Sequence, residues 1–153
     1  MTTHPLLHDA YIKAVVRALA DTGFDAAHYW TCDSDTRGLY FYLSSAITLT
    51  VEDSGIDAGR GPHGLVLTWE WHPGVEEGEA ERGPVWLWAK QQRDGSTTEP
   101  SSLPIDGYAN PLQVAAALHE LNSTGRTVKA RPGQWHSTPA LNAAITAWER
   151  GAK

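Results

Sequence analysis

Apolar and polar residues alternate along four short segments of the chain, residues 38–43, 47–51, 65–71 and 85–90. Side chains on a strand point to opposite faces of a sheet with a period of two, so this alternation predicts strands. The aromatic segment 27–33, which precedes a turn containing Asp and Gly, predicts one more. The connections are too short for crossover helices, so neighbouring strands are expected to pair antiparallel.

Some boundaries between these strands stay open. Residues 39–52 form either two strands or one long strand bent at Ser44 and Ser45, because two serines are a weaker turn signal than Asn-Gly. Residues 53–64 contain four glycines and a proline, which predicts a loop. The acidic run at 76–81 is expected to form the tip of a hairpin between the two tryptophan-rich strands.

Three other segments have apolar residues at helical spacing. Residues 4–21 carry one apolar stripe, and Gly23 is placed to end that helix. A capping residue followed by proline precedes each of the other two segments, which predicts helices over 111–122 and 139–150.

Together these elements predict an α+β fold. A single antiparallel sheet of four to five strands carries the N-terminal helix and one or two C-terminal helices on one face. We expect one domain over residues 1–153, with a core at 4–122 and a C-terminal extension at 123–153. Burying one aliphatic side chain is worth about 1.5–3 kcal/mol, so the aliphatic set should face the helices and fix the register. This set is Leu39, Phe41, Leu43, Ile47, Leu49, Val51, Leu65, Leu67, Val85 and Leu87.

The same parity predicts an aromatic patch on the other face. With the aliphatic residues in the core, Tyr40, Tyr42, Trp86 and Trp88 point away from it, and Glu70 and Lys90 form the rim. A patch of this size is unusual on a monomer, so a second subunit, a partner protein or a ligand should cover it. The alternative is that these aromatics are core beneath a second helix layer.

Three stretches carry a family resemblance: residues 11–19, the aromatic strands, and residues 111–118. Together they resemble a family of small uncharacterised actinobacterial proteins that consist of a helix, an antiparallel meander and a closing helix. The similarity covers about residues 8–122, and the acidic run at 76–81 and the chain after 122 depart from it. The resemblance implies this fold and brings no function with it.

Length and composition place the chain in the globular class. Its 153 residues are 41% hydrophobic and 20% charged, which excludes wholesale disorder. It has no apolar run long enough for a membrane span, and its N-terminus lacks the pattern of a secretory signal. A single cysteine, Cys32, is compatible with a reducing compartment, so we expect a cytoplasmic protein.

The net charge of -6 is unevenly distributed. Residues 23–105 contain 13 acidic and 5 basic residues, whereas residues 106–153 contain 3 acidic and 5 basic residues. An acidic sheet repels phosphate backbones, which disfavours nucleic acid and favours basic protein partners. The alternative is that the acidic loops serve only solubility.

Catalytic and metal-binding signatures are missing from the sequence. His119 is followed by Glu120 but has no second histidine one turn later, and His4 and His8 lie at a terminus expected to fray, so the histidines are interpreted as surface residues. The glycine-rich run 59–64 lacks the ending of a phosphate-binding loop and precedes a strand. We therefore assign no catalytic residue and no metal ligand, and we expect no cofactor.

Basic and aromatic residues interleave in one later segment, at Arg126, Lys129, Arg131 and Trp135. Arginine and indole pair well with flat anionic groups, so this segment is a secondary binding candidate. The alternative is a solvated loop between helices, with Trp135 folded back onto the edge of the sheet.

Three functions are compatible with these features. The leading hypothesis is a non-catalytic interaction module, of the immunity, antitoxin or phage-inhibitor type, that binds a protein partner or its own copy through the aromatic patch. The second is a binder of a small ligand or nucleotide, in which a planar molecule stacks on the same aromatics with help from Arg126 or Arg131. The third is an enzyme of unrecognised class.

Overall fold

The computed structural model describes residues 6–35, 41–73, 83–127 and 133–151. Its five strands form one antiparallel sheet in the order β1-β2-β3-β4-β5. The α+β fold predicted from the sequence, with one N-terminal helix and helices after the sheet, is confirmed. The elements are α1 (Asp9–Asp21), β1 (His28–Asp35), β2 (Phe41–Leu49), α2 (Val51–Ser54), β3 (Leu65–His72), β4 (Gly83–Lys90), β5 (Ser101–Ser102), α3 (Pro111–Thr124) and α4 (Thr138–Gly151).

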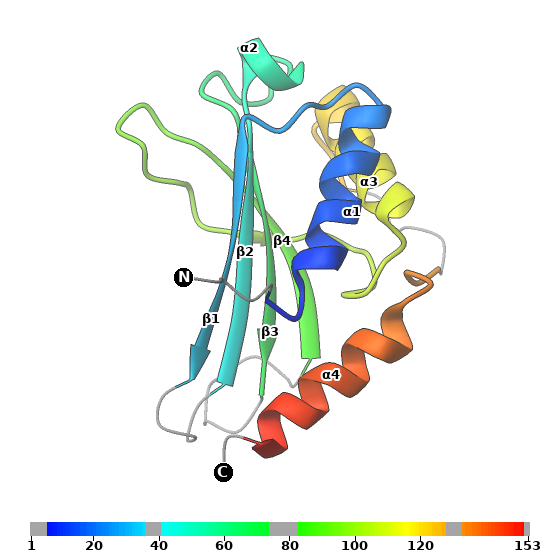
Figure 1. Ribbon diagram of the computed structural model, residues 1–153. Coiled ribbons are helices and arrows are strands. Elements are labelled where there is room, and N and C mark those ends of the chain that lie inside the picture. Colours follow the sequence, from blue (N-terminus) through cyan, green and yellow to red (C-terminus); the bar gives the residue numbers. More distant parts are fainter. Residues whose placement is uncertain (1–5, 36–40, 74–82, 128–132, 152–153) are drawn as a thin grey trace.

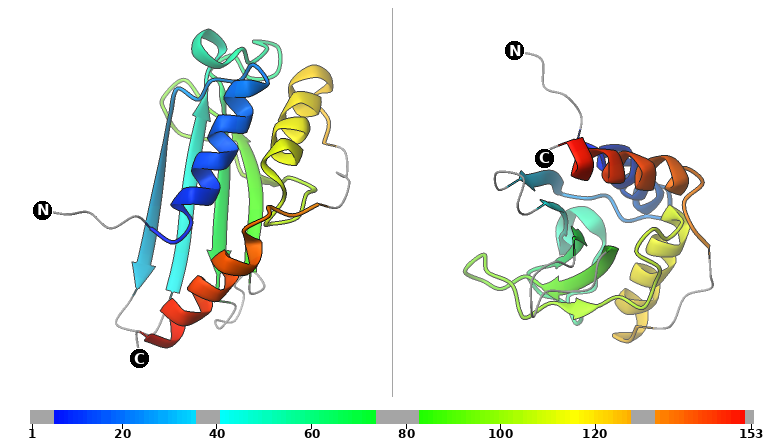
Figure 2. Two further views of the ribbon diagram at one scale, coloured as in Figure 1. Left: turned by 45° about the vertical axis from the view of Figure 1, so that its right-hand side comes forward. Right: turned by 90° about the horizontal axis from the view of Figure 1, so that it is seen from below.

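The three long helices lie on one side of the sheet. Figure 1 views the strands nearly edge-on, with α1 and α3 next to each other and α4 crossing near one end of the strands. Figure 2 shows the same layering along the strands, where the sheet curves away from the helices. No helix within the described ranges covers the opposite side, which is called the open face below.

Helix α1 supplies the centre of the helix layer. It buries Tyr11, Ile12, Val15 and Leu19, which recur at the spacing of one helical face. The predicted start near residue 4 is too early, because the helix begins at Asp9. The Asp9 carboxylate accepts a hydrogen bond of 2.8 Å from the backbone N–H of Leu6, which precedes the first turn.

Helix α3 begins at the predicted proline and continues two residues past the predicted end at 122, to Thr124. The Asn110 side chain accepts a hydrogen bond of 3.0 Å from the Leu112 N–H, and Pro111 occupies the first helical position. At the other end, Gly125 adopts a left-handed conformation with φ 75°, and its N–H donates to the Leu121 carbonyl at 2.8 Å.

The second strand is one element rather than two. Strand β2 runs from Phe41 to Leu49 through both serines, and the buried Ser45 hydroxyl donates to the Trp69 carbonyl at 3.3 Å. The strand ends because Thr50 caps α2, accepting a hydrogen bond of 3.0 Å from the Asp53 N–H. Val51, predicted as a core strand residue, is therefore the first residue of a short helix.

The predicted facing of β4 is wrong. Trp86 and Trp88 pair directly with Trp69 and Leu67, which are fully buried, so both tryptophans lie on the helix side. Val85 and Leu87, expected in the core, are half-buried on the open face. Alternation separates the two sets of side chains but does not say which set faces inward, and here the larger indoles fill the space beneath the helices.

Two other members of the predicted aliphatic set cannot be placed. Leu39 and the Phe41 side chain lie outside the described residues, as do Tyr40 and the acidic run at 76–81. The remaining aliphatic positions of β2 and β3 face the helices as predicted. They are Leu43, Ile47, Leu49, Leu65 and Leu67.

Candidate functional site

The residues predicted to form one aromatic patch lie on two sides of the sheet. Trp86 is fully buried, and Trp88 is half-buried against the core on the helix side. Lys90 shares that side, because it pairs with the buried Leu65. Tyr42 and Glu70 point to the open face and are half-buried there. A single surface made of these residues is thus ruled out, because β4 presents its tryptophans inward.

The two central tryptophans fix the segment that leads into α3. Trp69 Nε1 donates a hydrogen bond of 2.7 Å to the Gly107 carbonyl. Trp86 Nε1 donates to the Tyr11 hydroxyl at 3.2 Å, and that hydroxyl donates to the Ala109 carbonyl at 2.6 Å. Both indole N–H groups are thereby satisfied in the core, and residues 107–109 are held against the sheet.

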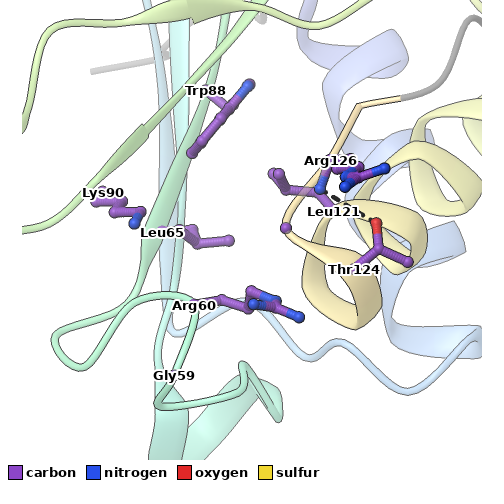
Figure 3. Close-up of a pocket in the computed structure, with 9 residues that line it drawn as sticks. Gly59, Arg60, Leu65, Trp88, Lys90, Leu121, Thr124 and Arg126 are labelled. Carbon is purple, nitrogen blue, oxygen red and sulfur yellow. Dashed lines mark hydrogen bonds between the residues drawn. The ribbon is translucent and has the colours of Figure 1, made fainter.

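A pocket of about 280 Å³ opens between the helix side of β3 and β4 and the C-terminal end of α3 (Figure 3). Its walls come from three parts of the chain that are distant in sequence, residues 59–65, 88–90 and 121–126. The lining residues are Gly59, Arg60, Leu65, Trp88, Lys90, Leu121, Thr124, Gly125 and Arg126.

One wall of the pocket is a loop docked onto the end of α3. Asn122 joins the two segments twice, because its Oδ1 accepts a hydrogen bond of 2.7 Å from the Asp57 N–H and its Nδ2 donates to the Gly55 carbonyl at 3.4 Å. Arg60 Nε and Nη2 donate to the carbonyls of Asn122 and Ser123 at 3.3 and 3.0 Å. Arg60 therefore caps the negative end of α3.

The polar lining of the pocket is positively charged. Arg60, Lys90 and Arg126 line it, and no carboxylate of the described residues does. The ion pair recorded among the described residues, His72 with Glu70, involves none of these cations. Arg60 uses Nε and Nη2 at the end of α3, and its Nη1 has no hydrogen-bond partner in the described part of the chain. This part of an acidic protein can accept negative charge.

Trp88 supplies the flat apolar wall. Figure 3 views its ring edge-on, with Leu121 and Arg126 across the pocket from it and Leu65 beside it. Its Nε1 is buried and has no hydrogen-bond partner within the described ranges. The part of this half-buried indole that lines the pocket can contact a planar molecule by its face.

The secondary candidate segment reaches the pocket through one residue. Arg126 lines it, whereas Lys129 and Arg131 lie outside the described residues. Trp135 packs elsewhere, with its ring centre 5.1 Å from that of Tyr11. Arg60 was not predicted as a binding residue, although an isolated arginine in the glycine-rich loop of the acidic half of the chain was a usable signal.

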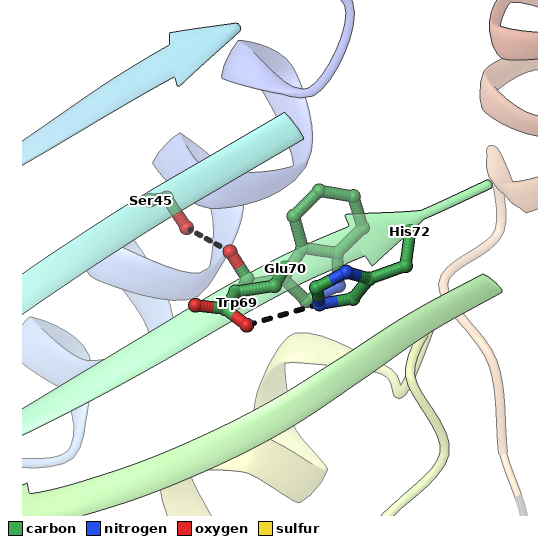
Figure 4. Close-up of polar contacts among 4 residues, drawn as sticks. All are labelled: Ser45, Trp69, Glu70 and His72. Atoms are coloured by element: carbon green, nitrogen blue, oxygen red, sulfur yellow. Dashed lines mark hydrogen bonds and ion pairs between the residues drawn. The ribbon is translucent and has the colours of Figure 1, made fainter. Parts of the chain in front are cut away.

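The open face carries a separate polar pair. His72 Nε2 contacts Glu70 Oε2 at 3.1 Å (Figure 4). The His72 ring centre also lies 4.9 Å from that of Tyr42. Trp69, which directly precedes Glu70 in β3, points to the other side of the sheet. A carboxylate beside an imidazole also occurs as a structural ion pair, so this contact alone does not indicate catalysis.

The interpretation of all histidines as surface residues is wrong for one of them. His8 is fully buried and stacks on Trp69 with a ring separation of 5.3 Å. Its Nε2 lies 2.8 Å from the Ser44 carbonyl, which can only accept, so Nε2 carries the proton. Burial lowers the pKa of His8, against the opposing influence of the Ser44 carbonyl and of the Asp9 and Asp33 carboxylates.

The described residues contain no group of three or more His, Cys, Asp or Glu side chains that could hold a metal ion. No helix in the described ranges is both long and apolar enough to cross a membrane. Comparison of the chain with known proteins finds no matching family model, no similar curated protein and no similar solved structure.

Proposed function

We propose that the protein binds a small anionic ligand with a planar ring in the pocket at the end of α3. The carrying observation is that Arg60, Lys90 and Arg126 line one pocket together with Trp88, and that no carboxylate of the described residues lines it. The proposal corresponds to the ligand-binding function considered from the sequence, with Arg60 added to Trp88, Lys90 and Arg126 as binding residues.

Electrostatics support an anion at this position. The chain has a net charge of -6, so three cations at one pocket differ in sign from the molecule as a whole. The carbonyls at the end of α3 would repel an anion, but Arg60 already hydrogen-bonds to two of them. Lys90 and Arg126 are exposed and remain able to contact a phosphate or carboxylate.

The apolar part of the lining indicates the rest of the ligand. Trp88 offers a flat surface, and Leu65 and Leu121 are buried side chains that close the apolar floor. Stacking of an aromatic base on such a ring contributes about 1–3 kcal/mol. A planar ring that carries a phosphate or a carboxylate, as in a mononucleotide, combines both requirements.

Calorimetric titration with AMP, adenosine and inorganic phosphate tests this proposal. AMP should bind more tightly than adenosine or phosphate, because only AMP engages both the indole and the cations. Added salt should weaken AMP binding, since the exposed cations are screened. Equal affinity for AMP and adenosine would contradict an anionic site.

Charge-removing variants locate the site. Lys90→Gln and Arg126→Gln should each weaken AMP binding about tenfold, because a hydrogen bond to a charged group contributes about 1.5–3 kcal/mol. Lys13→Gln and Arg17→Gln remove the same charge from exposed positions on α1 outside the pocket lining and should leave the affinity unchanged. Similar losses in all four variants would show a general charge effect instead of a site.

Protein binding, the leading hypothesis from the sequence, needs a surface other than the aromatic patch, because the described members of that patch lie on two sides of the sheet. For an enzyme, the Glu70 and His72 pair on the open face is the feature to which a catalytic role would attach. A cytoplasmic location remains part of the proposal and is supported by the exposed, free thiol of Cys32.

A further inference from the structure

Strand β1 is a long edge of the sheet. It pairs with β2 over eight residues, and no described strand pairs with its other side. The opposite edge is different, because β5 contains only two residues. An edge strand presents a row of backbone N–H and C=O groups that another strand can pair with, and short edges limit such pairing.

The sequence of β1 lacks two common protections against pairing. It contains no proline and no lysine, and its residues are HYWTCDSD. Two of the three large hydrophobic side chains exposed among the described residues lie here, Tyr29 at 38% and Trp30 at 50% exposure. The strand is also held firmly, because Thr31 hydrogen-bonds to Asp9 of α1 while the backbone pairs with β2. An exposed aromatic on a fixed edge is typical of an interface.

We propose that β1 pairs antiparallel with β1 of a second copy of this chain. The backbone edge specifies a strand as the partner, and a copy supplies a strand of equal length with the same exposed aromatics. The two sheets would join into one of ten strands, because each contributes five. The pocket involves β3 and β4 rather than β1, so this proposal does not depend on the proposed ligand.

Symmetry restricts the register of this pairing. A two-fold axis relating antiparallel strands is perpendicular to the sheet, so it keeps each side chain on its own face. In an antiparallel pair of identical strands, the numbers of any two directly opposite residues give the same sum, which defines the register. Directly opposite residues share a face, so this sum must be even. A sum of 62 centres the interface on Thr31, and a sum of 64 centres it on Cys32. A sum of 66 places Asp33 opposite its own copy, which like-charge repulsion disfavours.

Both favoured registers bring the two Cys32 side chains together on the open face. In the register centred on Cys32 they are directly opposite, at about 4.5–5.5 Å between Cβ atoms. In the register centred on Thr31, Cys32 lies opposite Trp30 of the copy, and the thiols are diagonal neighbours. Cys32 is exposed and free, so it reports on the interface without an introduced residue.

Sedimentation equilibrium tests the assembly. The apparent mass of the wild type should increase with concentration towards twice 16.7 kDa, and the Trp30→Lys variant should keep the mass of the monomer. Leu112→Lys is the matched control, because Leu112 is the third exposed large hydrophobic and lies on α3. This control should dimerise like the wild type, and both variants should keep the unfolding midpoint that the wild type shows at concentrations where it is monomeric.

Cross-linking tests the geometry. A short bismaleimide should link the wild type into a covalent dimer through Cys32, and Trp30→Lys should abolish the product. Cys32→Ser/Asn142→Cys places the thiol at an exposed position on α4 and should give no such product. A wild type that stays monomeric at high concentration overturns the proposal. So does a dimer that resists Trp30→Lys and is not cross-linked at Cys32.

Discussion

The indole of Trp86 donates a hydrogen bond of 3.2 Å to the hydroxyl of Tyr11, although the two residues are 75 positions apart. The hydroxyl in turn donates to the Ala109 carbonyl at 2.6 Å, so α1, β4 and the segment before α3 meet at one oxygen. Burial raises the pKa of Tyr11 well above its usual range, so the hydroxyl keeps its proton at every physiological pH. This contact explains why β4 turns its tryptophans inward.

Tyr11→Phe should destabilise the fold by more than a lost surface contact would. The substitution leaves the Trp86 N–H and the Ala109 carbonyl without their partner, at a cost of about 1–3 kcal/mol for each group. Urea denaturation measures the effect. Leu112→Ala, at an exposed side chain on α3, is the control and should change the free energy of unfolding by less than about 0.5 kcal/mol. Equal effects of the two substitutions would contradict this role of the Tyr11 hydroxyl.

Gly107→Ala should destabilise the protein by about 1–3 kcal/mol. A Cβ at this position would lie 2.3 Å from the Pro84 carbonyl oxygen, so β4 and the segment before α3 would have to separate. Gly133→Ala is the control, because a Cβ there meets no atom within 4 Å. The difference in thermal or urea midpoints checks the prediction, and a neutral Gly107→Ala would show that this close approach is not required.

His8 should make stability depend on pH. Burial lowers its pKa in the folded state, whereas the unfolded chain keeps the ordinary value of 6.5. Below about pH 6.5 the unfolded state therefore binds a proton that the folded state does not, and the free energy of unfolding falls by at most about 1.4 kcal/mol per pH unit. The loss continues until the pH reaches the folded-state pKa.

His8→Gln is the comparison for this prediction, because it keeps an N–H donor but does not titrate. The wild type should lose stability relative to the variant as the pH decreases from 7.5 to 5, measured by urea denaturation at each pH. A difference between the two proteins that is constant over this range would contradict the assignment.

Much of the fold was predictable from the sequence, because helix caps and alternation are local. The capped start of α3, the end of α1 and the antiparallel order of the strands all follow from short patterns. The orientation of β4 was not predictable from the sequence, because both of its faces are apolar. The choice between the two faces depends on Tyr11 and Ala109, which are distant in sequence. Placing the aliphatic residues inward therefore predicted the reversed orientation of β4.

The pocket was predictable only in parts. Trp88, Lys90 and Arg126 were named as binding residues, but in two separate sites, since nothing local connects β4 to the end of α3. Arg60 was missed because its position depends on hydrogen bonds to the carbonyls of Asn122 and Ser123, which only the fold provides. Sites assembled from distant segments need the tertiary structure.

The most direct measurement of the central claim is a titration of the ¹⁵N-labelled protein with AMP, followed by two-dimensional NMR. The Trp88 indole signal, identified through Trp88→Phe, and the backbone amides of Gly59 and Gly125 should shift together, because these residues line one pocket. The Trp30 indole, on the open face at the far edge of the sheet, should stay unchanged. Shifts that cluster away from Trp88, or no shifts at millimolar AMP, would contradict the account.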